Sequence, residues 1–194
     1  MAPHLVLEWI GSDYRAIAAD RSDAAFRKIN PAGAVPALDT GEGWILTQAG
    51  AVLQYLARRF PDAGLSGDGT PRDDAEVDRW SSFFTGDLHP AFFPLFVASR
   101  YTTNTDEASL AATKQAGILL VQKQLALLDA HMAGRRHIVG DRWSIVDAYA
   151  FPMLRWASSI LPDGLSSHPN AQGLLNRLQA DAAVQRVLRA EGLA

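Results

Sequence analysis

Hydrophobic positions from residue 71 onward recur every three or four residues, which is the spacing of helices with one buried face. The first of these patterns runs over 77–95. Pro90 and Pro94 predict a kink or break near its middle, because a proline ring clashes with the preceding helical turn. Similar patterns mark further helices over 110–132, over 145–160, after Pro169 and after Asp181, which suits an N-cap. This part of the chain is therefore predicted to be entirely helical.

The segment before residue 71 contains shorter patterns of mixed type. Pro3 suits the first turn of a helix, because the N–H that proline lacks would have no partner there, and Gly11 ends that helix. Residues 14–18 are predicted to form a strand with outward polar positions. Ser22 is predicted to cap a short helix over 23–29.

The most specific local pattern follows this short helix. A turn at 30–33 leads into an apolar strand over 36–38, which begins with a proline whose missing N–H can face away from the ladder. Residues 39–43 have the composition of a hairpin loop, and 44–47 form the predicted return strand. Thr47 is then predicted to cap a helix that continues to about residue 60.

Composition divides the chain into two domains. Its 194 residues provide enough chain for more than one core. Glycine, proline, serine and aspartate accumulate over 61–70, which is the composition of a linker. We place the linker at 63–70, between a first domain over 1–62 and a helical domain over 71–194.

The strongest signal in the helical domain is a capping box. Ser144 stands at the predicted N-cap and Asp147 three residues later, where glutamate is commoner. Such a pair satisfies backbone N–H groups at the start of a helix. Its role is in folding and not in catalysis.

The overall composition is that of a soluble globular protein, with 48% hydrophobic and 20% charged residues. A net charge of −3 without a dense basic stripe argues against a nucleic-acid partner. The absence of cysteine excludes disulfides, cysteine-based zinc sites and a cysteine nucleophile, and the histidines lack metal-ligand spacing. No apolar run reaches the ~20 residues of a membrane span, and the first residues do not resemble a signal peptide. We therefore expect a cytoplasmic protein without a metal or a membrane partner.

Two stretches of the first domain, NPAGAVPAL and ILTQAGAVLQYLARRFPD, resemble the thioredoxin-like domain of cytosolic glutathione S-transferases. RWSIVDAY, MLRWA and LRAEGLA resemble the bacterial beta-type members, and the resemblance covers nearly the whole chain. It implies an α/β plus all-α fold, in which a thioredoxin-like domain precedes a C-terminal helical bundle. The family begins with a strand before its first helix. Because this sequence resembles the family from the first helix onward, we expect the first strand to be absent.

The resemblance implies a glutathione site in the first domain. In the family, the residue before the proline of the Val-Pro pair pairs its backbone with the cysteinyl part of glutathione, across a cis bond. That assigns the backbone of Val35 and a cis Pro36. The γ-glutamyl carboxylate binds at a helix N-terminus, which here corresponds to Gln48 and Ala49. The family usually has glutamate and then serine or glycine at these two positions, so a serine hydroxyl is missing.

The residue that activates the thiol has no counterpart in this sequence. Family members use a tyrosine, serine or cysteine at the end of the first strand or the start of the first helix. His89 matches a histidine that faces the glutathione sulfur in beta-type members, which implies an auxiliary catalytic role. The alternative is a histidine that bonds a nearby carbonyl on a helix face. Four aromatic residues at helical spacing are candidates for the lining of the electrophile pocket, and the alternative is that they belong to the core: Phe92, Phe93, Phe96 and Trp156.

The resemblance implies an enzyme that conjugates the thiol of glutathione, its co-substrate, to small hydrophobic electrophiles, as in detoxification. It also implies a homodimer. Two alternatives remain: a non-catalytic dimer that binds glutathione or an apolar ligand, and a structural dimer whose glutathione site is vestigial. Glutathione affinity and turnover distinguish the three.

Overall fold

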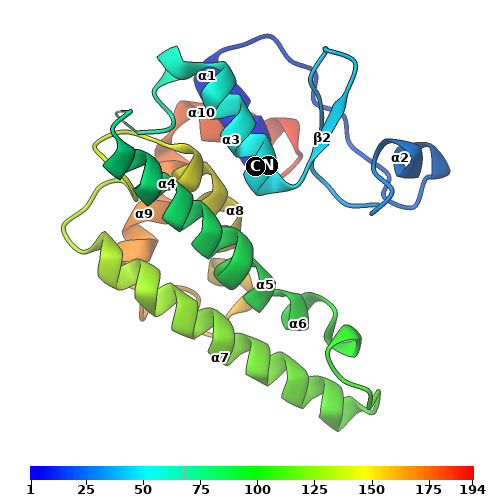
Figure 1. The fold of residues 1–194 in the computed structure, drawn as a ribbon. Coiled ribbons are helices and arrows are strands. Elements are labelled where there is room, and N and C mark those ends of the chain that lie inside the picture. The colour runs from blue at the N-terminus through cyan, green and yellow to red at the C-terminus, as the bar shows by residue number, and fades with distance from the viewer. Residues whose placement is uncertain (68) are drawn as a thin grey trace.

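The computed structural model describes residues 1–67 and 69–194. Its first part contains helices and one small sheet (Figure 1). The elements are α1 (Ala2–Ile10), α2 (Ala24–Ile29), β1 (Ala37–Asp39), β2 (Ile45–Thr47), α3 (Ala49–Arg59) and the 3-10 turn η1 (Pro61–Ala63). The predicted linker over 63–70 includes Asp68, which lies outside the described residues.

The sheet is the predicted hairpin. β1 and β2 pair antiparallel, with Ala37 opposite Thr47 and Asp39 opposite Ile45. The backbone N–H of Thr40 closes the loop by donating to the carbonyl of Trp44 at 3.3 Å. Within the described residues the sheet has two strands.

The predicted strand over 14–18 is wrong. These residues have no helix or strand assigned, and residues 15–18 are exposed. A strand is stabilised by a ladder to a neighbour, and β1 and β2 pair with each other. The hydroxyl of Tyr14 instead donates to the carboxylate of Glu8 on α1.

Two predicted helix caps are wrong by one residue. Ser22 donates from both its N–H and its hydroxyl to Asp20, and Asp23 caps α2 by accepting from the N–H of Ala25 at 2.8 Å. Thr47 is still part of the β2 ladder, so the N-cap of α3 is Gln48. In both cases the predicted cap residue takes part in another interaction: Ser22 bonds to Asp20, and Thr47 pairs with Ala37.

The helical part begins with one long, interrupted segment. α4 (Pro71–Phe83) continues through a π-helical turn, η2 (Phe84–Leu88), into α5 (His89–Ala91) and α6 (Phe93–Phe96). The break predicted from Pro90 and Pro94 is confirmed. The remaining elements are the 3-10 turn η3 (Ala98–Arg100) and the helices α7 (Glu107–Met132), α8 (Ile145–Ile160), α9 (Pro169–Ala180) and α10 (Ala182–Ala190).

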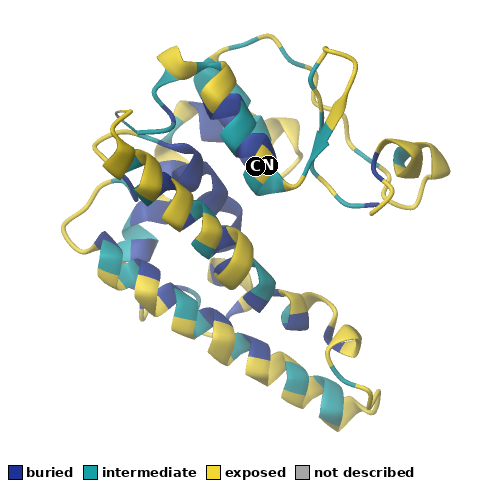
Figure 2. Ribbon diagram, viewed as in Figure 1, coloured by how far each residue is buried: buried dark blue, intermediate teal, exposed yellow. Residues whose placement is uncertain are grey.

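The core is centred on α8. Every residue of this helix from Ile145 to Leu154 is buried, as Figure 2 shows by its dark colour. Helices that are apolar on all sides are buried on all sides. α1, α3, α4 and α9 pack against α8, and α1 also packs against α3 and α10. α1 thus joins the first part of the chain to the helical part.

The predicted capping box starts α8. The N–H and hydroxyl of Ser144 donate to one carboxylate oxygen of Asp147 at 3.0 and 2.7 Å. The other oxygen accepts from the backbone N–H of Ile138 at 3.0 Å, so the box also holds the preceding loop. Burial raises the pKa of the Asp147 carboxyl to about 6, although these hydrogen bonds lower it.

An aromatic stack holds α1 against the helical part. The indole of Trp9 lies parallel to that of Trp143, at 4° and a centroid distance of 5.7 Å. Its Nε1–H donates to Asp181, the N-cap of α10, at 3.2 Å. At the other end of α1, the amino group of Met1 pairs with Glu191 at 3.0 Å.

None of the helices among residues 1–67 and 69–194 combines the length and the apolar character that a membrane span requires.

Candidate functional site

A buried asparagine shapes the loop that precedes β1. Asn30 is 6% exposed, and its side-chain amide donates to the carbonyl of Ala34 at 2.6 Å. Its Oδ1 accepts from the N–H of Ala32 at 3.2 Å. Gly33 has a φ of +59°, which favours glycine. The turn was predicted from the sequence, but this role of Asn30 was missed. The sequence feature that could have indicated it is the Asn30-Pro31 pair.

The loop presents the backbone of Val35 at the surface. The Val35–Pro36 bond is cis, as the resemblance implies. Val35 is 58% exposed. In the described part of the chain, its N–H and C=O have no hydrogen-bond partner. They lie just before β1, where a peptide can continue the ladder.

The N-terminus of α3 follows β2. Gln48 has a φ of +71° and makes no side-chain cap, so among the described residues no side chain satisfies the first N–H groups of the helix. Such groups and the helix dipole together favour an anion. A methyl group built on Gly50 would lie 2.9 Å from Cγ2 of Thr85, so η2 passes close to this helix end.

His89 follows η2, four residues after Thr85. Its Nδ1 lies 3.0 Å from the hydroxyl of Tyr149 on α8. Its ring is 5.1 Å from Phe93 and 5.3 Å from Trp156, measured between centroids. Burial lowers the pKa of His89 and raises that of Tyr149 to about 12. Both side chains are therefore neutral at pH 7. The hydrogen-bond partner of His89 is the hydroxyl of Tyr149, and not a backbone carbonyl as in the alternative given in the sequence analysis.

The four predicted pocket aromatics form one cluster with different exposures. Phe92 has no exposed surface and stacks on Phe96 at 6.0 Å and 15°. Trp156 meets both rings edge to face, at 5.5 and 5.1 Å. Phe93 and Phe96 are 38% and 45% exposed. The apolar surface beside His89 therefore consists mainly of Phe93 and Phe96, with Phe92 beneath them.

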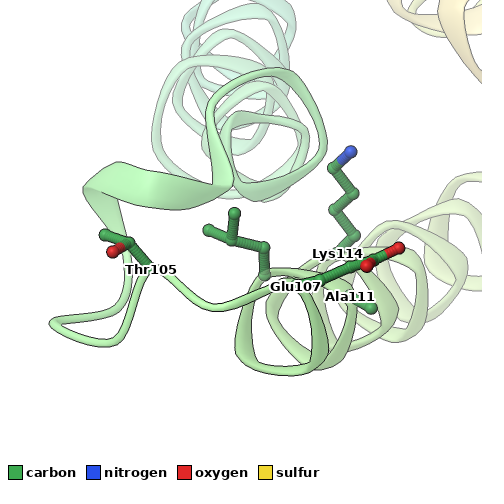
Figure 3. A pocket seen from close by; sticks show the side chains of 5 residues that line it. Thr105, Glu107, Ala111 and Lys114 are labelled. Atoms are coloured by element: carbon green, nitrogen blue, oxygen red, sulfur yellow. The ribbon is translucent and has the colours of Figure 1, made fainter.

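Two hollows lie away from these residues. One of about 390 Å³ lies at the start of α7, where Thr105, Glu107 and Lys114 surround it (Figure 3). The other, of about 290 Å³, lies between the start of α4 and the loop before α8. Neither contains an aromatic or a histidine side chain. Among the described residues no group of three histidine, aspartate or glutamate side chains is placed to hold a metal ion.

Most of the predicted site residues lie on elements that are connected to one another in the structure. Val35 and Pro36 lead into β1, Gln48 and Ala49 follow its partner β2, and the contact between Gly50 and Thr85 connects α3 to the helix that carries His89. Tyr149 was missed, because only the packing of α8 against this helix brings it to His89. Ser144 and Asp147 lie in the capping box.

The sequence comparison decides the family. A glutathione S-transferase of Xanthomonas campestris, GST-4.5, is 38% identical over 196 residues, which is 100% of this chain and 94% of that protein. The chain belongs to the glutathione S-transferase family. Models of the N-terminal and C-terminal domains of glutathione S-transferase match residues 2–64 and 88–181. They confirm the predicted fold class, a thioredoxin-like domain followed by a helical domain.

Solved structures of family members agree with this placement. A bacterial beta class glutathione S-transferase from Sphingomonas chungbukensis is 32% identical, with a TM-score of 0.85. A sphingomonad glutathione S-transferase complexed with glutathione has the same identity and TM-score. Each match covers 100% of this chain and 94% of the other. The predicted resemblance to bacterial beta-type members is confirmed.

Proposed function

We propose that this family member binds glutathione and conjugates its thiol to small hydrophobic electrophiles, as in detoxification. The observation that carries the proposal is the presence of two backbone sites that have no partner within residues 1–67 and 69–194: Val35, whose N–H and C=O make no hydrogen bond, and the N-terminus of α3, which has no side-chain cap. A relative of 32% identity is complexed with glutathione, which supports the same ligand here.

Each open site suits one part of the tripeptide. The cysteinyl unit of glutathione adds to the hairpin as a short strand along Val35, because an amide unit satisfies an N–H and a C=O together. The γ-glutamyl carboxylate binds the N–H groups of Gln48 and Ala49. There the helix dipole contributes about 0.3–1 kcal/mol at an exposed site.

The thiol and its electrophile are then placed beside the helix that carries His89. A thiol with a pKa near the ~8.5 of cysteine is mostly protonated at pH 7, so a nearby hydrogen-bond donor raises the thiolate fraction. His89 is the candidate for this auxiliary role. The exposed faces of Phe93 and Phe96 offer an apolar surface for the electrophile.

Proline at the first position of α3 tests the carboxylate site. Ala49→Pro removes one N–H, and proline is tolerated at this helical position. We expect glutathione to bind about tenfold more weakly, because a hydrogen bond to a charged group is worth ~1.5–3 kcal/mol. Ala182→Pro makes the same change at the first position of α10 and is the control.

Calorimetry with glutathione and turnover of a chromogenic electrophile decide between the functions. Absence of glutathione binding would overturn the proposal and favour a structural module. Glutathione binding without turnover of several electrophiles would favour a non-catalytic binding protein. Equal affinity in Ala49→Pro and the wild type would show that the carboxylate binds elsewhere.

We also propose that two copies form a twofold homodimer. Leu120 and Leu127 lie two turns apart on one face of α7 and are 46% and 55% exposed. Trp44 and Ile45 of the hairpin are also large apolar residues at the surface, at 42% and 39%. Burial of such side chains is the main driving force of stable association.

Sedimentation at micromolar concentration tests the dimer. The wild type is expected to sediment as a dimer, and the double variant Leu120→Glu, Leu127→Glu as a monomer. Leu193→Glu introduces the same charge at another exposed leucine, near the end of the chain, and serves as the control. A wild-type monomer would contradict the proposal.

A further inference from the structure

The imidazole of His89 is held by α8 at two points. The hydroxyl of Tyr149 lies 3.0 Å from Nδ1 of His89, within a hydrogen bond. Trp156, two turns later on α8, packs against the imidazole with 5.3 Å between the ring centroids. Phe93 contacts the ring from its own helical segment at 5.1 Å. The orientation of the imidazole therefore depends on side chains 60 and 67 positions away in the sequence.

The hydrogen bond has a preferred direction. Tyr149 is 5% exposed, and among the described residues its hydroxyl has no partner other than His89. If Nδ1–H donated to the hydroxyl oxygen, the buried O–H would have no acceptor, which costs free energy. If the hydroxyl donates to Nδ1, both groups are satisfied. A neutral imidazole that accepts at Nδ1 carries its proton on Nε2.

The other ring nitrogen is accessible. In the part of the chain that the structure describes, Nε2 of His89 has no hydrogen-bond partner, and it is not among the buried polar atoms without a partner. It therefore reaches the surface. Thr85, one helical turn before His89, lies next to Gly50 at the start of α3. The free N–H thus belongs to a helical segment that borders the proposed glutathione site.

We propose that Tyr149 is a positioning residue, whose hydroxyl fixes His89 in the tautomer with the proton on Nε2 and so keeps a hydrogen-bond donor ready for the glutathione sulfur. This inference rests on the proposed function. The thiol releases its proton to solvent, and His89 keeps its own proton while it donates to the thiolate. Tyr149 acts through His89 and does not touch the substrate.

The tautomer is measured directly by NMR. In protein with ¹⁵N-labelled histidine, the His89 signals are assigned by their loss in His89→Ala. We expect Nδ1 at the shift of an unprotonated nitrogen and Nε2 at that of a protonated one. In Tyr149→Phe, which keeps the ring, the two tautomers should mix. A wild-type His89 protonated at Nδ1 alone would overturn the inference.

Kinetics connect the tautomer to the reaction. Tyr149→Phe is expected to lower kcat about fivefold, the factor that one neutral hydrogen bond supplies, with the KM for glutathione unchanged within about twofold. In the His89→Ala background the same change should have no effect, because residues that act through one group are not additive. Tyr101→Phe removes an exposed hydroxyl and is the control.

The outcomes separate this inference from the proposed function. An unchanged kcat in Tyr149→Phe, or the same loss with and without His89, would overturn the positioning role even if the wild-type protein is active. A wild-type protein without turnover would overturn the proposed function, and the tautomer spectrum would still decide whether Tyr149 sets the state of His89.

Discussion

Replacement of Asp147 by alanine tests how strongly the buried capping box stabilises the helical domain. The carboxylate has no exposed surface and accepts from the N–H of Ile138 and from the N–H and hydroxyl of Ser144, at 2.7–3.0 Å. Alanine leaves two buried N–H groups without a partner, and each costs about 1–3 kcal/mol. We expect the free energy of unfolding to fall by about 3–5 kcal/mol, a large part of the ~5–15 kcal/mol of a typical domain.

Asp106 provides a matched control for this change. Its carboxylate also accepts from the N–H and hydroxyl of a serine, Ser109, at 3.0 and 2.7 Å, but it does so at the exposed start of α7. Water can replace it there, so Asp106→Ala should lower the free energy of unfolding much less than Asp147→Ala does. Urea unfolding at pH 7, followed by far-ultraviolet circular dichroism, measures both variants. A loss in Asp147→Ala no larger than in Asp106→Ala would refute the reasoning.

Further predictions concern pH, the domain contact and a helix crossing. The pKa of Asp147 is raised to about 6, above the ordinary ~3.9. Folding therefore favours the protonated carboxyl, and the stability that this preference adds is complete below pH ~4 and lost as pH rises through 6, while the hydrogen bonds from Ile138 and Ser144 to the carboxylate remain at pH 7. The stability difference between the wild type and Asp147→Asn should shrink from pH 4 to 7; a constant difference would contradict this. Trp9→Phe removes the hydrogen bond to Asp181 and should lower the free energy of unfolding by about 1 kcal/mol in urea titrations; no change would show that this bond contributes nothing. Gly117→Ala places a methyl against Cδ1 of Leu95 on α6 and should cost about 1–3 kcal/mol, whereas Gly173→Ala, with only the end of an arginine at 3.4 Å, should be neutral or stabilising; equal melting temperatures would exclude the clash.

The helical part was predictable because its signals are local. The three-to-four-residue pattern, the prolines at 90 and 94 and the caps at Ser144 and Asp181 each act within one or two helical turns. The hairpin was predictable for the same reason, since a loop of five residues sets its register.

Apart from the two caps that were wrong by one residue, the errors arose where a partner lies far away in the sequence. Residues 14–18 have a strand-like pattern, but in the part of the chain that the structure describes no strand lies beside them to complete a ladder. The tyrosine that holds His89 is 60 positions away, and neither residue indicates the other. The difference between buried Phe92 and exposed Phe93 also depends on the packing of α8, which the aromatic run itself does not reveal.

The π-helical turn η2 has a consequence for how this helix can evolve. Such a turn holds one more residue than an α-helical turn, and an α-helix advances about 100° per residue. Everything after residues 84–88 is therefore rotated by about that angle relative to α4. A side chain on Gly86 would contact nothing within 4 Å, so substitutions are tolerated there, but loss of that residue would rephase the helix. The imidazole of His89 would then turn away from Tyr149. The contact between His89 and Tyr149 thus depends on the number of residues in the turn 84–88, and not on the identity of any residue in that turn.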